Sequence, residues 1–411
     1  MAGGMMAPGT EYREKVKHLI NKGVEIINPL YTDVGDEVDV DRISGKGVRI
    51  WPGSRIYGKH TVISEGCRIG KEAPVTVDDC RLGAEVELKG GYFTRSVFLD
   101  KANMGLGAHV REGCLLEEEA NGAHCVGIKQ TILFPFVTLG SLINFCDCLM
   151  SGGTSRKDHS EVGSSYIHFN FTPEGDKTTA SLIGDVPRGV MLNQPAIFLG
   201  GQGGIVGPIR MGFGNIVAAN SVLRGDYHED NRLIIGKTPS PRVVPYVRGA
   251  YPGLKRIVEN NVIYLANLAA LEEWYLHVRR PFFEARELGQ LVFEGAVEML
   301  FLAKLERLKR LETLAEKVMS SPERGTDAAF RKAFSKNFHA MEAVLVSAVR
   351  DKETEKLRDE FMSLADKIQS ASPGYIGFVQ GLPVNVSRIG TAWLQRIVDV
   401  SREKYMDMLK T

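Results

Sequence analysis

Cysteine and histidine are the residues of this sequence best suited to bind a metal ion or to act as nucleophiles and bases. The chain has nine histidines and no close His-x4-His pair, whereas a catalytic zinc site needs several such ligands from neighbouring segments. The six cysteines stand mostly singly beside apolar residues. We therefore expect structural thiols and no metal site, with Cys146-Asp147-Cys148 as the one cluster that keeps a disulfide or metal role open.

Two long polar stretches are the next places to look for chemistry. They cover residues 117–125 (EEEANGAHC) and 155–177 (SRKDHSEVGSSYIHFNFTPEGDK). The second contains His159 and His168, and imidazole groups exchange protons near neutral pH. Function usually lies on loops that a rigid scaffold holds out. We therefore treat both histidines as candidates, against the alternative that they are surface or hydrogen-bonding residues.

The scaffold itself is indicated by a six-residue spacing of apolar side chains. The spacing joins Met211, Val217 and Leu223, and it recurs upstream, for example at Ile50 and Ile56. A period of six fits neither an amphipathic helix nor an alternating strand. It fits a chain that coils through short parallel strands, one on each face of a triangular prism. The sequence therefore predicts a parallel β-helix, whereas an antiparallel β-domain would need a period of two and hairpin turns.

The pattern changes along the chain and divides it into four parts. Residues 1–28 contain a short helix that we expect to cap the first coil, and residues 29–226 carry the six-residue pattern. Residues 227–254 are rich in proline and glycine, as in a linker. Residues 255–411 are rich in Leu, Ala, Glu, Lys and Arg with helical periodicity. We expect a mainly β protein with a C-terminal α-helical domain.

Composition argues against several classes of partner. The 411 residues have a formal net charge of +1 and a pI of about 7.6, so no bulk field recruits nucleic acid or an acidic membrane. The N-terminus lacks a basic segment followed by an apolar one, and no apolar run reaches the length of a membrane span. We expect a cytoplasmic protein that binds neither nucleic acid nor membrane.

The coil region resembles the C-terminal half of the bifunctional N-acetylglucosamine-1-phosphate uridyltransferase/glucosamine-1-phosphate acetyltransferases. The resemblance covers roughly residues 15–226. It is carried by LINKGVEIINP, GAHVREG, EVGSSYIHFNFTPEGDK, SLIGDVPRG and GPIRMGFGNIVAANSVLRGD. No GxGTRM-type nucleotide loop precedes these segments, so acyl transfer is expected and uridylyl transfer is not.

This resemblance implies a left-handed β-helix, a homotrimer with its sites between subunits, and acetyl-CoA or another acyl-CoA as co-substrate. The implied acceptor is an amino sugar phosphate or a nucleotide sugar. The positions that match the family's phosphate-binding cations are Arg111, Lys129 and Lys177, its Asn-Tyr pair matches Asn170-Phe171, and its coenzyme A contacts match Ser164 and Ala219.

The family's catalytic histidine has no counterpart at the matching position. Counting back from VGSSYIHFNF, that position falls on Asp147, whose carboxyl is a poor base at its ordinary pKa. His159 and His168 are the candidate replacements. Two hypotheses therefore stay open: an acyltransferase with a relocated base, or a sugar-phosphate-binding or scaffold protein that has lost the catalytic histidine and contacts a protein partner through its helical domain.

Overall fold

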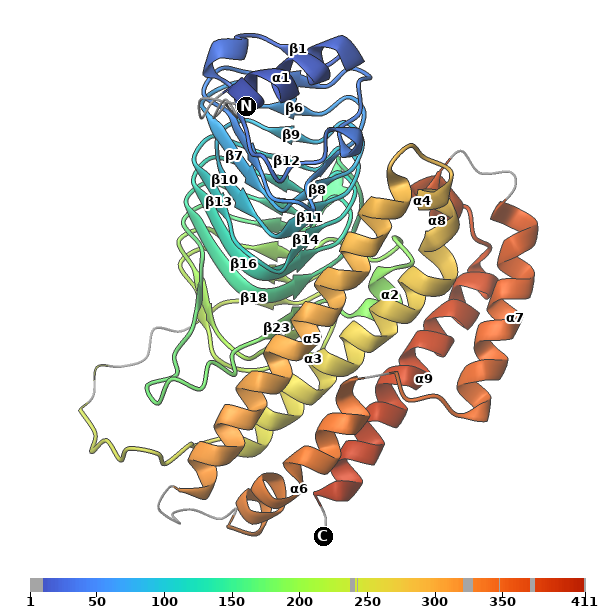
Figure 1. The fold of residues 1–411 in the computed structure, drawn as a ribbon. Coiled ribbons are helices and arrows are strands. Elements are labelled where there is room, and N and C mark those ends of the chain that lie inside the picture. The colour runs from blue at the N-terminus through green and yellow to red at the C-terminus, as the bar shows by residue number, and fades with distance from the viewer. Residues whose placement is uncertain are drawn as a thin grey trace, which may run out of the picture. The chain divides into compact units, whose positions relative to one another are not determined.

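The computed structural model describes residues 10–236, 241, 243–320, 328–346, 348–369 and 374–409. The fold is a parallel β-solenoid of about 11 turns followed by a helical region (Figure 1). The fold class predicted from the six-residue spacing is therefore confirmed. The chain forms two compact units, which are described separately: unit 1 is Met1–Cys146 with Phe283–Met299, and unit 2 is Asp147–Phe282 with Leu300–Thr411.

Unit 1 opens with a helix and then winds into coils. Helix α1 (Thr10–Lys22) ends just before Gly23, whose φ of 109° is open to glycine. Two short 3-10 turns follow at Pro29–Tyr31 and Val40–Arg42. One face of the coil is formed by β1 (Glu25–Ile26), β3 (Arg49–Ile50), β6 (Arg68–Ile69), β9 (Glu87–Leu88), β12 (Asn103–Met104), β15 (Asn121–Gly122) and β17 (Thr138–Leu139).

The other two faces of unit 1 are formed by a second set of parallel strands. The second face contains β2 (Asp33–Val34), β4 (Arg55–Tyr57), β7 (Val75–Asp78), β10 (Gly91–Thr94) and β13 (Ala108–Val110). The third contains β5 (Val62–Ile63), β8 (Arg81–Leu82), β11 (Ser96–Phe98) and β14 (Cys114–Leu116). Strand β16 (Val126–Leu133) pairs with both β13 and β14. A long strand such as β16 bends around a corner of the coil and forms part of two faces.

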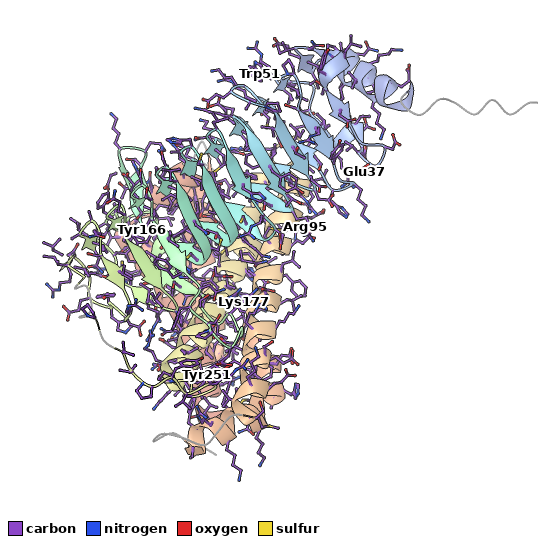
Figure 2. The ribbon with its side chains drawn as sticks, turned by 90° about the vertical axis from the view of Figure 1, so that its left-hand side faces the viewer. Glu37, Trp51, Arg95, Tyr166, Lys177 and Tyr251 are labelled. Atoms are coloured by element: carbon purple, nitrogen blue, oxygen red, sulfur yellow. The ribbon has the colours of Figure 1, made fainter. Side chains whose placement is uncertain are left out.

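The core of each coil is a stack of equivalent aliphatic side chains. In unit 1, Ile50 pairs with Ile69 and Ile69 with Leu88, and Leu88 pairs in turn with Met104. All four side chains are fully buried. The residue before each of them points outward, so one strand supplies both a core residue and a surface residue. Figure 2 shows the stacked strands with side chains projecting from their outer faces.

Unit 2 continues the same architecture with longer interruptions. Strand β18 (Ile143–Met150) enters it at Asp147, and an antiparallel hairpin follows, β19 (Gly153–Ser155) with β20 (Asp158–His159). The parallel strands are β21 (Glu161–Val162), β22 (Ile167–Phe169), β23 (Ser181–Ile183), β24 (Phe198–Leu199), β25 (Gly204–Val206), β26 (Arg210–Met211), β27 (Ile216–Val217), β28 (Val222–Leu223) and β29 (Leu233–Ile234). The last strand lies within the segment that the sequence analysis assigned to a linker.

The helices begin inside the coil and dominate after it. They are α2 (Val186–Gly189), α3 (Leu254–Trp274), a π-helical turn at Tyr275–Arg279, α4 (Arg280–Glu284), α5 (Gly289–Met319), α6 (Ala328–Val346), α7 (Lys352–Gln369), α8 (Tyr375–Gln380) and α9 (Val384–Met408). In unit 2, helices α3, α5, α6 and α9 share an apolar core that includes Val262, Leu311 and Phe334. The rings of Trp274, Phe361 and Trp393 form a second cluster, with centroids 5.6–6.4 Å apart.

The stacking of coils predicts that Gly91→Ala destabilises the fold. Gly91 has a φ of 135°, and a Cβ built on it lies 2.1 Å from the carbonyl oxygen of Ala108 on the next coil. Backbone atoms cannot move aside, so we expect a loss of about 2 kcal/mol or more in the free energy of unfolding. Urea denaturation followed by circular dichroism measures it.

Gly225→Ala is the matched control. A Cβ at Gly225 meets nothing within 4 Å, and its φ is not in the left-handed region. We expect a change within about 0.5 kcal/mol. Equal stability of the two variants would contradict the stacking described here.

Candidate functional site

The polar excursion of residues 170–180 leaves the coil of unit 2 beside Asp147. Cys148 pairs with Ser181 in parallel strands β18 and β23. The residue before Cys148, Asp147, therefore lies next to the end of the excursion. Asp147 has a φ of 57°, as expected where a coil turns a corner. The position that matches the family's catalytic histidine thus stands at the root of the longest loop in its neighbourhood.

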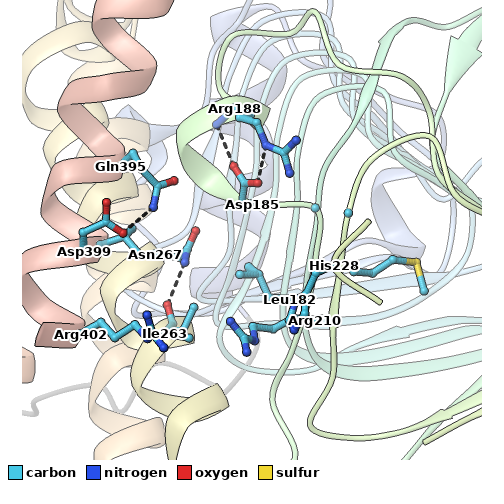
Figure 3. A pocket seen from close by; sticks show the side chains of 14 residues that line it. Leu182, Asp185, Arg188, Arg210, His228, Ile263, Asn267, Gln395, Asp399 and Arg402 are labelled. Carbon is cyan, nitrogen blue, oxygen red and sulfur yellow. Dashed lines mark hydrogen bonds and ion pairs between the residues drawn. The ribbon is translucent and has the colours of Figure 1, made fainter. Parts of the chain in front are cut away.

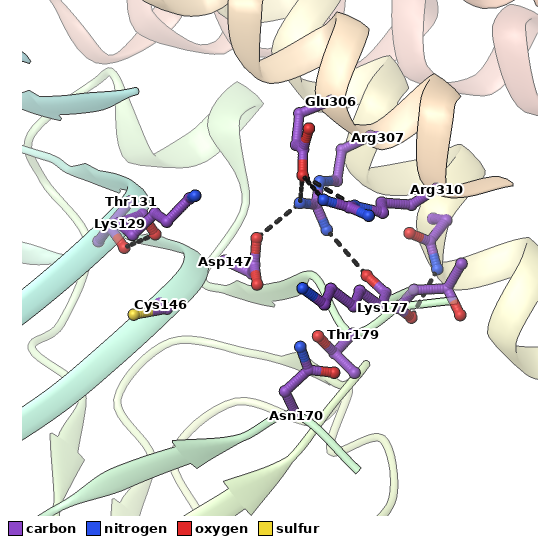
Figure 4. A network of polar contacts seen from close by, with 12 residues as sticks. Lys129, Thr131, Cys146, Asp147, Asn170, Lys177, Thr179, Glu306, Arg307 and Arg310 are labelled. Atoms are coloured by element: carbon purple, nitrogen blue, oxygen red, sulfur yellow. Dashed lines mark hydrogen bonds and ion pairs between the residues drawn. The ribbon is translucent and has the colours of Figure 1, made fainter. Parts of the chain in front are cut away.

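Asp147 is held by an arginine from helix α5. The Arg307 Nη2 atom lies 2.6 Å from the Asp147 carboxylate, and the Arg307 side chain is only 3% exposed. Arg307 also donates from Nη1 to the backbone carbonyl of Lys177 at 3.5 Å. Glu306 pairs with Arg310 at 2.6 Å and lies 3.8 Å from Arg307 (Figure 4). The loop, the coil corner and the helix are thereby joined by one network of charges.

Two predicted binding residues of unit 2 meet at this network. Lys177 and Asn170 are both exposed, and Figure 4 shows the Lys177 side chain directed toward the Asp147 carboxylate, with Asn170 below it. The Asn170 Oδ1 atom accepts a hydrogen bond from Thr172. Phe171, at the position of the family's tyrosine, is 68% exposed. Lys177 and Asn170 are therefore available to a ligand at the Asp147 corner.

The other two predicted cations, Arg111 and Lys129, belong to unit 1. Lys129 forms an ion pair with Glu112. Burial is the largest influence on the pKa of Glu112 and acts to raise it, but the hydrogen bond from Lys129, a backbone hydrogen bond and the positive charges of Lys129 and Arg95 together lower that pKa. The Nη2 atom of Arg111 lies 3.7 Å from the Cys146 sulfur. Within unit 1, Lys129 is thus neutralised by Glu112 unless a stronger anion displaces that carboxylate.

His168 points into the coil and is a structural residue. It lies on β22 between two outward-facing residues, and its side chain is buried. Its Nε2 atom lies 2.8 Å from the Ser181 hydroxyl. Burial lowers the pKa of His168 to about 3, so the ring is neutral at physiological pH. No substrate reaches a side chain enclosed in this way.

His159 is the candidate base whose geometry suits proton transfer. It lies on β20, and its Nδ1 atom is 2.9 Å from the backbone carbonyl of Arg156. In a neutral ring, donation from Nδ1 to this carbonyl leaves Nε2 as the nitrogen without a proton. That atom lies 3.8 Å from the Glu161 carboxylate, on a side chain that is 21% exposed.

His159 and Lys177 leave the coil at opposite ends of one strand face. Lys177 belongs to the excursion beside Asp147, whereas the hairpin that carries His159 follows Met150. The three strand residues between these ends, Cys148 to Met150, span roughly 10 Å. The hairpin contacts α8, because Gln380 donates to the Thr154 carbonyl, while the other excursion contacts α5. A single chain therefore does not bring His159 to the Lys177 corner.

The two predicted coenzyme A contacts share a third corner of unit 2. Ser164 follows β21 and Ala219 follows β27, and both are exposed. The coil between them places Gln202 N 2.8 Å from the Ser164 carbonyl and Asn220 N 2.9 Å from the Gly201 carbonyl. Small residues thus follow one another along this corner and leave its backbone open to a ligand.

The arginines of α5 were missed in the sequence analysis, although a signal was present. The buried stripe of α5 runs through Leu300, Leu308 and Leu311 at helical spacing, and Arg307 falls within it. A charged residue in an apolar stripe needs a partner. Arg307 meets this need by facing the coil corner, where it pairs with Asp147.

Cys146 and Cys148 form no disulfide in the structure. Cys146 is half-buried and Cys148 is buried. In the part of the chain that the structure describes, no three His, Cys, Asp or Glu side chains are grouped as metal ligands. Among the helices described, none is both long and apolar enough to span a bilayer.

Comparisons with known proteins give similarity to solved structures alone. No protein family model matches the sequence, and no curated protein matches it. A solved structure, UDP-N-acetylglucosamine acyltransferase from Campylobacter jejuni, aligns over 66% of this chain and 95% of its own, with 14% identity and a TM-score of 0.20. At this identity and TM-score, the similarity carries no information about the site of this chain.

The Asp147–Arg307 pair predicts that Asp147→Asn destabilises unit 2. The substitution leaves the Arg307 guanidinium buried without its nearest counter-charge, which we expect to cost about 3 kcal/mol in the free energy of unfolding. Chemical denaturation measures the loss. The double variant Asp147→Asn/Arg307→Met removes both charges, so it should be more stable than Asp147→Asn alone.

Arg232→Gln provides the matched control for this ion pair. Arg232 pairs with Glu229 at 2.7 Å, with side chains 62% and 73% exposed. Water screens such a pair, so the change should stay within about 0.5 kcal/mol. An Asp147→Asn chain as stable as the Arg232→Gln chain would contradict the proposed strength of the corner contact.

His168 predicts a loss of stability in acid. The unfolded chain protonates this group near its ordinary pKa of 6.5, whereas the folded chain does so only at about 3. Between these values the unfolded state binds more protons, so stability falls as the pH falls, by about 1.4 kcal/mol per pH unit.

Urea unfolding between pH 7 and pH 4 measures this slope. A His168→Asn chain should show a shallower slope by that amount. Parallel curves for the parent and His168→Asn would show that His168 titrates normally when folded.

Proposed function

We propose that the chain is an acyltransferase-like protein that binds a sugar phosphate or nucleotide sugar at the Asp147 corner and transfers an acyl group to it from an acyl-CoA. The observation that carries the proposal is the meeting of exposed Lys177 and Asn170 with the buried Arg307 at this corner. The resemblance of the coil segments to the acetyltransferase family supports the same assignment.

The charges at the corner favour an anionic ligand. Lys177, Arg307 and Arg310 supply three positive charges, whereas Asp147 and Glu306 supply two negative ones. One positive charge is therefore in excess, and the Lys177 side chain that contributes to it is exposed. Charge-assisted hydrogen bonds from Lys177 and from the Asn170 amide would hold a phosphate group, and Arg307 fixes the loop that presents them.

The transfer step needs a base near the acceptor amine. The amine nitrogen attacks the thioester carbonyl carbon, a C–N bond forms, and the C–S bond breaks. The Nε2 atom of His159 takes the amine proton and returns it to the departing coenzyme A thiolate. The Nδ1 contact with the Arg156 carbonyl orients the ring for this role. Ser164, Gly201 and Ala219 line the open backbone along which we place the pantetheine arm.

The separation of His159 from Lys177 makes the subunit arrangement part of the proposal. Within one chain the two side chains leave at different corners, so a shared site requires His159 of one subunit to face Lys177 of the next. A homotrimer, which the family resemblance implies, provides three such interfaces. The proposed activity therefore depends on assembly, and a monomer should bind the sugar phosphate without transferring the acyl group.

A non-catalytic sugar-phosphate-binding protein is the second candidate function. It is favoured by the state of Asp147, which occupies the position of the family's histidine and is engaged by Arg307 at 2.6 Å. In this case the corner would bind its ligand as proposed, and the only role of His159 would be to stabilise the hairpin.

Mixing two impaired variants, assayed at an acceptor concentration well below the KM of the parent, separates these functions. His159→Asn removes the base and should lower the rate of thiol release from acetyl-CoA at least 100-fold, with glucosamine 1-phosphate or a UDP-linked amino sugar as acceptor. Lys177→Gln should raise the KM for the acceptor about tenfold. Co-refolding the two variants should restore activity, since mixed trimers contain interfaces with both native residues.

His124→Asn is the control, because His124 is an exposed histidine outside the proposed site, and its Nδ1 atom lies 2.9 Å from the Ser141 hydroxyl. Its activity should match the parent. Mixed assemblies without restored activity would exclude the shared site. Sugar-phosphate binding without any thiol release by the parent would establish the binding protein instead.

A further inference from the structure

Unit 2 contains a cavity that the proposed function does not use. Its volume is about 410 Å³, within the range of small-molecule sites. The walls come from β23 and β26 of the coil and from helices α2, α3 and α9. Arginines from three of these elements line it: Arg188, Arg210 and Arg402 (Figure 3). None of the residues of the Asp147 corner takes part.

Arg210 is the charge that the cavity leaves uncompensated. Its Nε atom donates to the Asn260 side chain at 2.8 Å, which fixes the guanidinium and leaves its two terminal nitrogens on the cavity side. Among the residues described, no carboxylate lies within ion-pair distance of it. Burial lowers the pKa of Arg210, while the carboxylates of Asp226 and Glu259 act from farther away to raise it. The side chain stays charged at neutral pH.

Arg402 brings a second guanidinium into the same space. It projects from α9 toward Arg210, as Figure 3 shows, and its charge is one of the causes that lower the pKa of Arg210. Glu259 pairs with Arg402 at 2.7 Å, and the Arg402 side chain is half-exposed. Two like charges that face one another across a cavity repel each other. An anion between them would attract both guanidinium groups.

The remaining walls suit the uncharged part of a ligand. Arg188 is fully engaged, since Asp185 and Asp230 lie 2.7 and 2.6 Å from it. Gln395 donates to Asp399 at 2.9 Å and offers its amide oxygen to the cavity. Ile263, Val398 and Met211 contribute apolar surface. The cavity thus combines a cationic end with mixed polar and apolar walls.

We propose that this cavity binds a small organic phosphate, with its phosphate group between Arg210 and Arg402 and its organic part against Ile263, Val398 and Met211. The phosphate supplies the anionic partner that Arg210 lacks among the residues that the structure describes. The volume exceeds the need of inorganic phosphate, so the organic part contributes to binding. This proposal is independent of the acyltransferase assignment, because it rests on other residues.

Isothermal titration calorimetry of the full chain with glucose 6-phosphate tests the cavity. The titrations use a Lys177→Gln background, which weakens the Asp147 corner and leaves the cavity intact. In that background we expect one binding event, a Kd weakened at least tenfold by Arg210→Gln, and a Kd weakened at least threefold by Arg402→Gln. Inorganic phosphate should bind more weakly than glucose 6-phosphate.

Arg224→Gln is the matched control, since Arg224 is exposed and lies outside the cavity, and its Kd should stay within twofold of the background. Circular dichroism checks each fold. If Arg210→Gln fails to fold because Asn260 loses its contact, the Arg402→Gln variant tests the proposal instead, because Arg402 is half-exposed. The proposal is overturned if neither phosphate binds, or if both Arg210→Gln and Arg402→Gln bind like Arg224→Gln.

Discussion

The stacking of each coil on the next is the constraint on which the rest of this structure depends. A parallel coil holds its shape only where equivalent positions carry equivalent aliphatic side chains, as the pairs Ile50–Ile69 and Ile69–Leu88 show. Inward positions are therefore closed to chemistry, and a polar residue placed there must be neutral and hydrogen-bonded. His168, bonded to Ser181 and buried, obeys this rule. Function is left to the corners and to the loops that leave them.

The helical region completes the corner of unit 2 from outside the coil. Arg307 reaches Asp147 and the Lys177 backbone from α5, and Lys317 of the same helix donates to the Glu174 carbonyl. Burying the Arg307 charge is unfavourable unless a carboxylate pairs with it. The pair consequently fixes the excursion of residues 170–180 relative to α5. The corner of unit 2 is therefore held in place by a contact between the coil and a helix.

Much of the fold followed from the sequence, and part of the site did not. The six-residue spacing of Met211, Val217 and Leu223 reports a local repeat, so the solenoid could be predicted from it. The matched positions Lys177 and Asn170 lie beside Asp147 in unit 2. The role of Arg307 could not be predicted, because its partner Asp147 lies 160 residues away in sequence. Long-range ion pairs leave no period in a sequence. The extent of the coil was underestimated for a similar reason, since β29 follows an irregular segment.

The division between closed inward positions and open loop positions can be tested directly on the histidines. Diethyl pyrocarbonate acylates accessible neutral imidazole rings, and mass spectrometry of the digested chain gives a rate for each of them. On the folded chain at pH 7, we predict that His159 is modified while His168 is not, and that unfolding in urea removes the difference. Modification of His168 at the rate of His159 in the folded chain would contradict the account.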